Sequence, residues 1–419
     1  MKKIFLLSKF LALGLLITTF SCKKEVAKNQ LTSTLIQKSV DSNFVSMSFA
    51  SNIAVQSTTM KNGANKQSVN SLLPVQEKQI LDSLVLPDAT NPTCYVFNYV
   101  GGGFTMAAAD KRIQPILAYS DKGHFAVPDE QHTSGLNDWL SVNDKNMQIL
   151  RKNPQIKAPR KVISFWAKFT KKDVLTGKQT VTNLPPEGCI EGWTQYVVGP
   201  LLVTSWDQGW PYNDLCPAGH YSNDRTPTGC VATAMAQVMY YHQYPASYPW
   251  SSMITSWSGG TPANNYVAQL MLDAGTSVNM EYFDSGSHPH IYDPFIGNEY
   301  VIECSTALKN SFGYSSADEG DYNYINVMNN IDYNMPVLLQ ADDGSTGHEW
   351  VCDGYTTWTV QLCDPVTGGE YLFLHMNWGW GTYSSSVNGN YGDDVWTVTV
   401  GSETHYYQYN HHMTYNIHP

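Results

Sequence analysis

The chain has 419 residues, more than one ordinary domain usually holds, and 42% of them are apolar while 15% are charged. This balance supports packed cores and excludes a wholly disordered chain. The net charge of −11 is divided unevenly: residues 1–178 carry 23 basic and 12 acidic side chains (+11), and residues 179–419 carry 2 basic and 24 acidic ones (−22). Because phosphate contacts need Lys and Arg, nucleic-acid binding by the acidic part is disfavoured. The split predicts either a solvated acidic surface or a basic N-terminal part held on an acidic domain by complementary charge.

The N-terminus has the pattern of an export signal. Lys2 and Lys3 precede a short apolar stretch at 10–17, and small residues lead to Cys22. A basic start, a short apolar core and small residues before the cut are typical of a signal peptide, and the stretch is too short to span a bilayer. We therefore expect residues 1–21 to be removed and Cys22 to be lipidated, anchoring the chain to the outer membrane or cell surface. Ordinary secretion is the alternative.

The next region predicts a small domain. Residues 22–70 are polar with little periodicity, which indicates a lipidated tether followed by an irregular lead-in. Apolar residues at 72–86 have helical spacing, and a further helix is expected at 134–150. Short strands separated by Gly and Asp-Lys turns are expected between these helices, at 94–97, 103–106 and 113–119. Together these elements predict a small α+β domain over residues 71–150.

A basic segment separates this domain from the rest of the chain. Residues 151–178 hold nine basic residues and one acidic residue, with two prolines. Such a charge run is typical of a solvated linker, and solvated linkers are where proteases cut. We expect residues 151–190 to be a basic linker with an activation cleavage site, and residues 191–419 to form a second domain.

The eight cysteines show no regular framework. Cys352 and Cys363 flank a predicted hairpin and are candidates to pair in an oxidising compartment. Cysteines and histidines also cluster at 216–242. However, Cys230 and His242 are twelve residues apart on one predicted helix, or ~18 Å along its axis, which is too far to share a zinc ion. We therefore expect no metal site and no cofactor.

Cys230 lies where a helix begins. Gly229 and the preceding Thr-Pro-Thr prevent the helix from extending backwards, so Cys230 falls in its first turn. Unsatisfied backbone N–H groups and the helix dipole favour an anion there, which would lower the pKa of the thiol. The apolar residues that follow share one helical face: Val231, Ala234, Met235, Val238 and Met239. Cys230 is therefore a candidate nucleophile, with a buried structural cysteine as the alternative.

Two further residues complete a catalytic pattern. His348 begins a predicted strand, and Asn377 ends another apolar strand just before Trp-Gly-Trp-Gly. The histidine follows the cysteine by 118 residues and the asparagine follows the histidine by 29. This is the papain-like order. The three residues together favour nucleophilic catalysis by Cys230 with His348 as its base.

Several segments resemble the streptopain family of papain-like cysteine proteases. They are Gly-Pro-Leu-Leu at 199–202, Trp-Asp-Gln-Gly with Pro-Tyr-Asn within 206–213, Gly-Cys-Val-Ala-Thr-Ala-Met-Ala-Gln at 229–237, His-Met-Asn-Trp-Gly-Trp-Gly at 375–381 and Met-Thr-Tyr-Asn-Ile at 413–417. The resemblance covers 195–419, and residues 102–120 look like the inhibitory prosegment of that family. Thr382 departs from the pattern, because a second glycine is usual at that position.

The resemblance implies an α+β fold: a papain-like catalytic domain, in which a helix bearing the nucleophile packs on an antiparallel sheet, preceded by a small α+β prodomain. It implies that Cys230 is the nucleophile and His348 the general base. Gln208 would stabilise the oxyanion together with the backbone N–H of Cys230, Asn377 would orient His348, and Trp378 would pack nearby. It also implies a zymogen that cleaves proteins or peptides and is inhibited by its own prosegment.

Two other functions remain open at this point. A surface-binding lipoprotein would keep the fold and lose the activity, although a binding module has no need of Cys230, His348, Gln208 and Asn377 together. A papain-like acyl transferase or amidase would use the same Cys and His, and would differ in what resolves the thioester. Release of the mature domain after cleavage is the alternative to permanent anchoring.

Overall fold

The computed structural model describes residues 41–62, 77–127, 135–170, 192–220, 224–262, 264–289, 291–293, 298–300, 303–342, 347–361, 369–381, 387–393, 397–400, 403–406 and 411–419. Its helices are α1 (Met47–Asn62), α2 (Gly135–Lys152), α3 (Arg160–Thr170), α4 (Cys230–His242), α5 (Tyr266–Ser277), α6 (Cys304–Phe312) and α7 (Tyr324–Asp332), with a 3-10 turn at Trp250–Ser252. The strands of the main sheet are β1 (Ile80–Leu86), β2 (Cys94–Tyr99), β3 (Phe104–Ala108), β4 (Ile116–Ser120), β5 (Gly192–Val198), β10 (Ser316–Asp321), β11 (Val337–Asp342), β12 (Gly347–Gln361), β13 (Glu370–Asn377), β14 (Gly389–Gly392) and β17 (His412–His418). Three two-stranded ribbons pair β6 (Met280–Glu281) with β7 (His288–Pro289), β8 (Ile291–Asp293) with β9 (Asn298–Tyr300), and β15 (Thr397–Val400) with β16 (Glu403–Tyr406).

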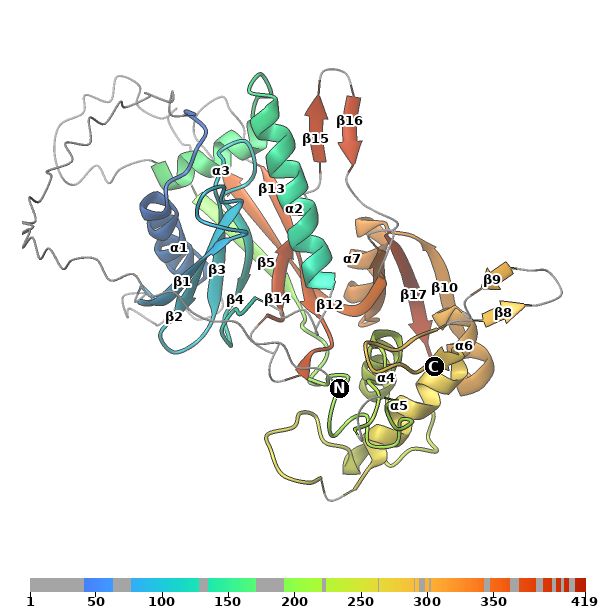
Figure 1. Ribbon diagram of the computed structural model, residues 1–419. Coiled ribbons are helices and arrows are strands. Elements are labelled where there is room, and N and C mark those ends of the chain that lie inside the picture. The colour runs from blue at the N-terminus through green and yellow to red at the C-terminus, as the bar shows by residue number, and fades with distance from the viewer. Residues whose placement is uncertain are drawn as a thin grey trace, which may run out of the picture. The chain divides into compact units, whose positions relative to one another are not determined.

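One antiparallel sheet runs through both parts of the chain. Its order is β1-β2-β3-β4-β14-β13-β12-β11-β17-β10, with β5 beside β12. The long strand β12 pairs first with β11 and then with β5, while β13 lies along its other edge. The N-terminal strands join the C-terminal ones where β4 meets β14, through the pairs Asn390↔Tyr119 and Tyr391↔Ala118. Figure 1 labels the strands on either side of this junction, from β1 in blue to β14 in red.

Two hydrophobic cores hold the helices to this sheet. The first contains buried residues of α1, α2, α3 and β2–β4 together with residues of β11–β14, so the N-terminal part shares its core with the C-terminal sheet. The second surrounds α4, which packs on α5 and on β12 (Figure 1). The buried face of α4 contains Val231, Ala234, Met235, Val238 and Met239, the residues predicted to share one face.

The predicted fold class is confirmed: a helix that begins at the candidate nucleophile packs on an antiparallel sheet, and a small α+β unit precedes it. The helix expected at 134–150 is α2, and the three expected short strands are β2, β3 and β4.

Two N-terminal elements differ from expectation. Helix α1 lies within the region 22–70 that was expected to be irregular. It packs on β3, and its buried apolar residues are Ala50, Ile53 and Ala54, whose helical spacing is obscured by the Ser and Thr around them. A helix was expected at 72–86, of which the structure describes 77–86. The prediction is wrong there, because Ile80–Leu86 is strand β1, paired along its length with β2. Tertiary pairing overrides helical spacing here.

The basic segment is not simply a linker. Helix α3 buries Val162, Phe165, Trp166 and Phe169, and the Trp166 indole donates a hydrogen bond to the Ile113 carbonyl. The prediction of a solvated linker is therefore wrong for 160–170. Its basic residues lie between apolar residues at helical spacing, and the charge count alone concealed the apolar face.

The proposed pairing of Cys352 with Cys363 is not supported. Cys352 is a free thiol, and Cys363 lies outside the described residues. The predicted signal peptide and Cys22 also lie outside them. In the part of the chain that the structure describes, no helix has the length and apolar character needed to cross a membrane.

Candidate active site

The candidate nucleophile is the first residue of α4. Gly229 precedes it with φ 87°, and a side chain there would bring its Cβ within 2.7 Å of the Met280 thioether and 2.9 Å of the Ser287 carbonyl oxygen. Only glycine combines this left-handed backbone with such a close approach. The helix is then secured by Thr233, whose N–H and hydroxyl both donate to the Gly229 carbonyl at 3.1 Å. The start of α4, and with it the position of Cys230, is therefore fixed by Gly229.

Burial dominates the chemistry of the thiol. It raises the pKa of Cys230 to about 11, although the backbone N–H groups of Glu349, Val231 and Cys230 itself act in the opposite direction. The expectation of a lowered pKa is wrong for this state of the protein, because withdrawal from water outweighs the helix N-terminus. Near neutral pH the group is a thiol rather than a thiolate.

His348 lies near the start of β12 and is 5% exposed. Its ring is parallel to the rings of Trp350 and Trp380, with centroids 6.1 and 5.8 Å away. Its Nε2 atom is 3.2 Å from the Trp378 carbonyl oxygen. Since a carbonyl only accepts, Nε2 carries the proton, and Nδ1 is left as an acceptor. Burial lowers the pKa of His348 to about 4, so the imidazole is neutral and has the protonation state of a general base.

The two residues of the predicted dyad belong to packed neighbours, because α4 lies against β12. The backbone N–H of Glu349, the residue after His348, is close enough to lower the pKa of the Cys230 thiol. Among the described residues, however, no hydrogen bond joins that thiol to the His348 ring. The structure therefore brings the pair together without forming the catalytic contact.

Gln208 lies next to the residues that lead into Cys230 and α4. Its backbone carbonyl accepts a hydrogen bond from the Thr228 N–H at 3.0 Å, two residues before Cys230. The intervening chain loops out and closes on itself, with the Thr226 N–H donating to the Pro217 carbonyl. Gln208 is 7% exposed, and within the described part of the chain its carboxamide has no hydrogen-bond partner. Its donors are therefore available to a substrate oxygen.

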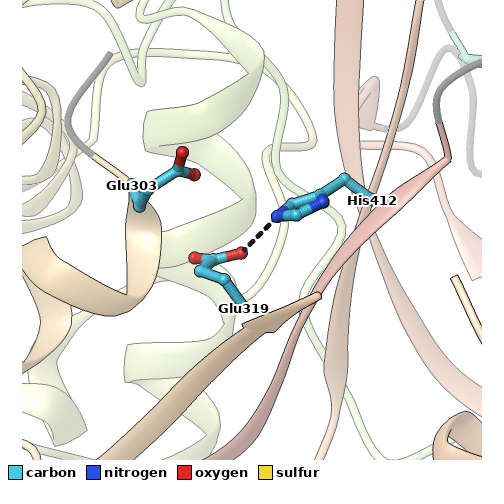
Figure 2. A group of neighbouring side chains, drawn as sticks. All are labelled: Glu303, Glu319 and His412. Atoms are coloured by element: carbon cyan, nitrogen blue, oxygen red, sulfur yellow. Dashed lines mark ion pairs between the residues drawn. The ribbon is translucent and has the colours of Figure 1, made fainter. Parts of the chain in front are cut away.

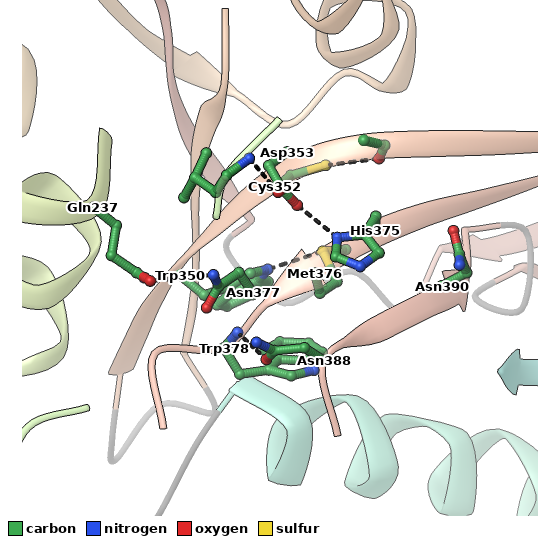
Figure 3. A network of polar contacts seen from close by, with 12 residues as sticks. Gln237, Trp350, Cys352, Asp353, His375, Met376, Asn377, Trp378, Asn388 and Asn390 are labelled. Carbon is green, nitrogen blue, oxygen red and sulfur yellow. Dashed lines mark hydrogen bonds and ion pairs between the residues drawn. The ribbon is translucent and has the colours of Figure 1, made fainter. Parts of the chain in front are cut away.

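Asn377 does not orient His348 in this structure. Its amide donates to Gln237 Oε1 at 3.1 Å, on the side of α4 (Figure 3). The same amide donates to the Thr204 carbonyl at 2.9 Å, and the Asn377 oxygen accepts from the Gly379 N–H at 3.3 Å. The orienting hydrogen bond instead runs from His348 Nε2–H to the backbone carbonyl of Trp378. The predicted proximity of Trp378 to the histidine is seen, whereas the role of Asn377 stays a prediction for the processed enzyme.

Sequence reasoning did not single out Gln237, Trp350, Trp380 or Glu349. Gln237 is fully buried on α4, seven residues after Cys230, and a glutamine on a buried helical face was the available signal. Trp350 and Trp380 stand two residues from His348 and Trp378, on the segments that were singled out. Glu349 is buried, and burial raises its pKa to about 8. Nothing in the sequence alone distinguishes that glutamate from a surface carboxylate.

An aromatic chain connects the N-terminal part to the histidine. Trp139 of α2 meets Tyr391 of β14 edge to face at 5.2 Å, and Tyr391 meets Trp378 in the same way at 5.1 Å. Trp378 lies 4.9 Å from Trp350, which is parallel to the His348 ring. The N-terminal helix α2 thus contacts the ring packing that surrounds the candidate base.

A second cluster has the spacing of metal ligands. Glu303, Glu319 and His412 place one ligand atom each within 4.8 Å of one another (Figure 2). Glu319 already pairs with His412 at 3.3 Å and accepts from the Ser305 N–H and the Thr414 hydroxyl, both at 2.8 Å. These partners satisfy Glu319 without an ion, so the cluster does not itself require a metal.

Comparisons with known proteins agree with this geometry. Residues 206–248 and 246–387 match the Peptidase C10 family, and residues 42–147 match the Spi protease inhibitor. The second match covers α1, β1–β4 and most of α2, the elements that share a core with the C-terminal sheet.

Individual relatives match about two thirds of the chain or more. The chain is 28% identical over 332 residues to the thiol protease/hemagglutinin PrtT of Porphyromonas gingivalis, a match that covers 69% of this chain and 32% of PrtT. It therefore spans about a third of that relative. It is 27% identical over 341 residues to streptopain of Streptococcus pyogenes serotype M1, covering 69% of this chain and 72% of streptopain. A solved fragment of prointerpain A from Prevotella intermedia superposes with a TM-score of 0.53 at 23% identity, covering 81% of this chain and 99% of the fragment. This superposition supports the fold.

Proposed function

Because the chain belongs to the Peptidase C10 family and carries a Spi protease inhibitor domain, we propose that it is the zymogen of a cysteine endopeptidase that acts on proteins or peptides through Cys230 and His348. One observation carries the assignment of the residues. His348 is held as a neutral imidazole with Nε2 protonated, on the strand against which the helix of Cys230 packs. That arrangement supplies a nucleophile and a base from adjacent elements.

In the first half-reaction, Nδ1 of His348 takes the proton of the Cys230 thiol, and the sulfur attacks the scissile carbonyl carbon. The carbonyl oxygen becomes an oxyanion, which the Gln208 carboxamide and the Cys230 backbone N–H stabilise. The imidazolium then gives its proton to the leaving amine as the C–N bond breaks. The acyl group remains on sulfur as a thioester.

In the second half-reaction, His348 accepts a proton from water, and the hydroxyl attacks the thioester carbon. The same two donors stabilise the second oxyanion. When it collapses, the C–S bond breaks, the carboxylic acid product leaves, and the thiol regains a proton. Nε2 keeps its proton, which the Trp378 carbonyl accepts in the intact chain, so only Nδ1 exchanges protons during the cycle.

The unprocessed chain is expected to be inactive. Its thiol is protonated, because burial raises the pKa of Cys230 to about 11, and no hydrogen bond connects it with His348 in the described residues. The N-terminal part shares a core with the catalytic sheet and pairs β4 with β14. We infer that removing this part allows the catalytic contact to form.

The activating cut is expected within 151–190, and α3 restricts where it can fall. Phe165 packs on Tyr371 of β13 at 4.2 Å and on Trp358 of β12 at 5.9 Å. Proteases cut exposed, extended chain. A cut within 160–170 would therefore require α3 to unfold from the sheet, which favours the remainder of the expected window.

Export and anchoring are part of the proposal and rest on the sequence. The basic start, the short apolar core and Cys22 after small residues support a signal peptide at 1–21 and a lipid on Cys22. We propose attachment to the outer membrane or cell surface, with release of the mature domain if processing separates it from Cys22. Intact-mass measurement of the membrane fraction, compared with Cys22→Ala, tests this. A soluble parent of unmodified mass would contradict lipidation.

Hydrolysis of a denatured protein by the reduced, processed chain tests the function. We expect cleavage that a thiol alkylator abolishes and that Cys230→Ala lacks. A silent binding lipoprotein would cleave nothing under any condition. An acyl transferase or amidase would leave internal peptide bonds intact and release ammonia, or transfer an acyl group, in the presence of a small amide and an amine.

A further inference from the structure

Gln237 connects three segments that carry the proposed catalytic groups. It belongs to α4, which begins with Cys230. Its Oε1 accepts one hydrogen bond from the Thr204 hydroxyl at 3.0 Å and one from the Asn377 amide at 3.1 Å. Thr204 stands four residues before Gln208 in the sequence. A single side-chain oxygen thus joins the nucleophile helix, the Gln208 segment and the end of β13.

The third segment leads directly to the histidine. Asn377 is the last residue of β13, and the next residue, Trp378, provides the carbonyl that binds His348 Nε2 at 3.2 Å. Figure 3 shows Gln237 reaching from α4 toward Asn377, which lies beside Trp378. The Asn377 amide also donates to the Thr204 backbone carbonyl at 2.9 Å, so the three residues form a closed set of hydrogen bonds. A shift of Asn377 would displace the Trp378 carbonyl.

The turn after Trp378 has little freedom to compensate. Gly379 and Gly381 both have positive φ, at 74° and 65°. A Cβ on Gly379 would approach Thr233 of α4 at 3.3 Å, and one on Gly381 would collide with the Asp207 carboxylate. The turn is therefore packed between α4 and the Gln208 segment. These are the two elements that Gln237 also holds.

The amide nitrogen of Gln237 indicates that stability alone does not explain this residue. Gln237 is 0% exposed, and its Nε2 has no hydrogen-bond partner within the described residues. An unsatisfied buried donor is costly, and an apolar side chain of similar shape would avoid that cost. Only the carboxamide oxygen of Gln237 makes hydrogen bonds among the described residues. Such a buried polar group fits a role in fixing geometry.

We propose that Gln237 is a positioning residue, which sets the His348-binding carbonyl of Trp378 relative to Cys230 and Gln208 through its bonds to Asn377 and Thr204. The inference rests on the proposed roles of Cys230 and His348. Gln237 touches no reacting atom. Its effect is on the geometry in which the imidazole, the thiol and the oxyanion donor meet.

The test uses the full chain, processed to the active enzyme. Gln237→Met keeps the length and burial of the side chain and removes the oxygen. Because misplacement of catalytic groups by ~1 Å can cost on the order of 10² in rate, we expect kcat to fall ~10–100-fold with KM within ~2-fold. We also expect the acid limb of the kcat/KM pH profile to move, since the imidazole contact changes. Gln237→Glu retains an oxygen acceptor and should recover most of kcat.

Two controls separate positioning from folding. Gln269 lies on the exposed surface of α5, so the control Gln269→Met should match the parent in kcat and pH profile. In a double-mutant cycle, Gln237→Met and Asn377→Ala should be non-additive, because both act through the same carbonyl. If Gln237→Met does not fold, Thr204→Val removes one of the two accepted bonds and should lower kcat a few-fold, with a pH shift in the same direction.

The inference is overturned if Gln237→Met, or Thr204→Val in its place, lowers the melting temperature while kcat and the pH profile stay at the parent values. Additive effects of Gln237→Met and Asn377→Ala would overturn it as well. Failure of the proposed function looks different: Cys230→Ala would then keep peptidase activity, whatever the behaviour of Gln237.

Discussion

The Nε2 atom of His348 lies 3.2 Å from the backbone carbonyl oxygen of Trp378. A carbonyl fixes the tautomer as firmly as a side-chain amide would, because it can only accept the N–H. The resemblance to papain-like proteases assigned this task to Asn377, one residue earlier. Since the acceptor is a main-chain atom, no side-chain substitution removes it, although a substitution can move it.

The first prediction follows from this acceptor. Trp378→Phe keeps the carbonyl and an aromatic ring, so we expect kcat to fall only a few-fold. His348→Ala removes the base and should cost ~10⁴ or more in kcat, as loss of a triad member typically does. Steady-state hydrolysis of a peptide substrate measures both, with circular dichroism to confirm folding. Substantial hydrolysis by folded His348→Ala would remove His348 from the mechanism.

The second prediction concerns the oxyanion. Gln208→Ala should lower kcat by ~10²–10³ and change KM little, because its carboxamide is expected to bind the oxygen only as charge develops there. Gln195→Ala on β5 is a suitable control, since its amide instead meets the Tyr119 hydroxyl of the N-terminal part at 3.3 Å. Unchanged kcat in Gln208→Ala would exclude that residue from the site.

The third prediction is a change in thiol reactivity on activation. In the intact chain, burial raises the pKa of Cys230 to about 11, so iodoacetamide should label it slowly at pH 7 and faster as the pH rises toward that value. After processing, contact with His348 should make labelling rapid near neutral pH. Cys230→Ser reports the background from the other cysteines. Equal labelling rates at pH 7 before and after processing would show that latency does not depend on the thiol.

The sequence predicted those site residues whose side chains lie beside a local pattern in the sequence. Cys230 was identified because Gly229 and the apolar periodicity mark a helix start, and His348 because strand pattern and chain order combine. The hydrogen bond from His348 to Trp378 was not predictable, since a backbone carbonyl leaves no residue-type signal. Gln237 left only a weak signal in the sequence, a glutamine on a buried helical face.

The fold was predictable where periodicity and composition agree, as in α2 and in strands β2–β4. It was missed where they conflict. Lysines concealed the apolar face of α3, and Ser and Thr concealed that of α1. The sequence predicted a lowered pKa for Cys230, whereas the pKa is raised, for a related reason. Its position at a helix start is visible in sequence, whereas the burial that outweighs it depends on the whole fold.

The fourth prediction concerns stability against pH. Burial raises the pKa of Glu349 from 4.5 to about 8, with Glu319 and Glu303 adding to the effect while the Cys304 thiol opposes it. Between about pH 4.5 and 8 the unfolded chain ionises this carboxyl and the folded chain does not. The unfolded state therefore binds fewer protons, and stability should fall as pH rises, by up to ~1.4 kcal/mol per unit from this group.

Glu349→Gln should lack this slope and be more stable than its parent at pH 8. Urea unfolding between pH 5 and 8 measures it, with Cys230→Ala in both chains to prevent self-cleavage. The difference between the two chains isolates Glu349 from other titrating groups. A parallel pH dependence in the two chains would mean that Glu349 is ionised in the folded state.

The last prediction concerns how the N-terminal part is held. The charge split predicts attraction between basic and acidic parts, which salt would screen as the Debye length falls from ~10 Å at 0.1 M to ~3 Å at 1 M. The structure shows another contribution: Trp139 packs on Tyr391, Phe165 packs on Tyr371, and Tyr119 lies 5.3 Å from both Trp358 and Phe373. Apolar contacts of this kind are not weakened by salt.

We therefore expect self-processing of the intact chain to be only slightly faster in 1 M than in 0.1 M NaCl. Trp139→Ala should accelerate it at both concentrations, because the substitution removes the aromatic contact between α2 and Tyr391, next to Trp378. Trp139→Phe keeps a ring at that position and should process at nearly the parental rate, which separates lost contact from general damage to α2. The appearance of the processed form over time, followed by gel electrophoresis, measures all three chains. Strong acceleration of the parent by salt, with no effect of Trp139→Ala, would mean that charge rather than aromatic packing keeps the enzyme latent.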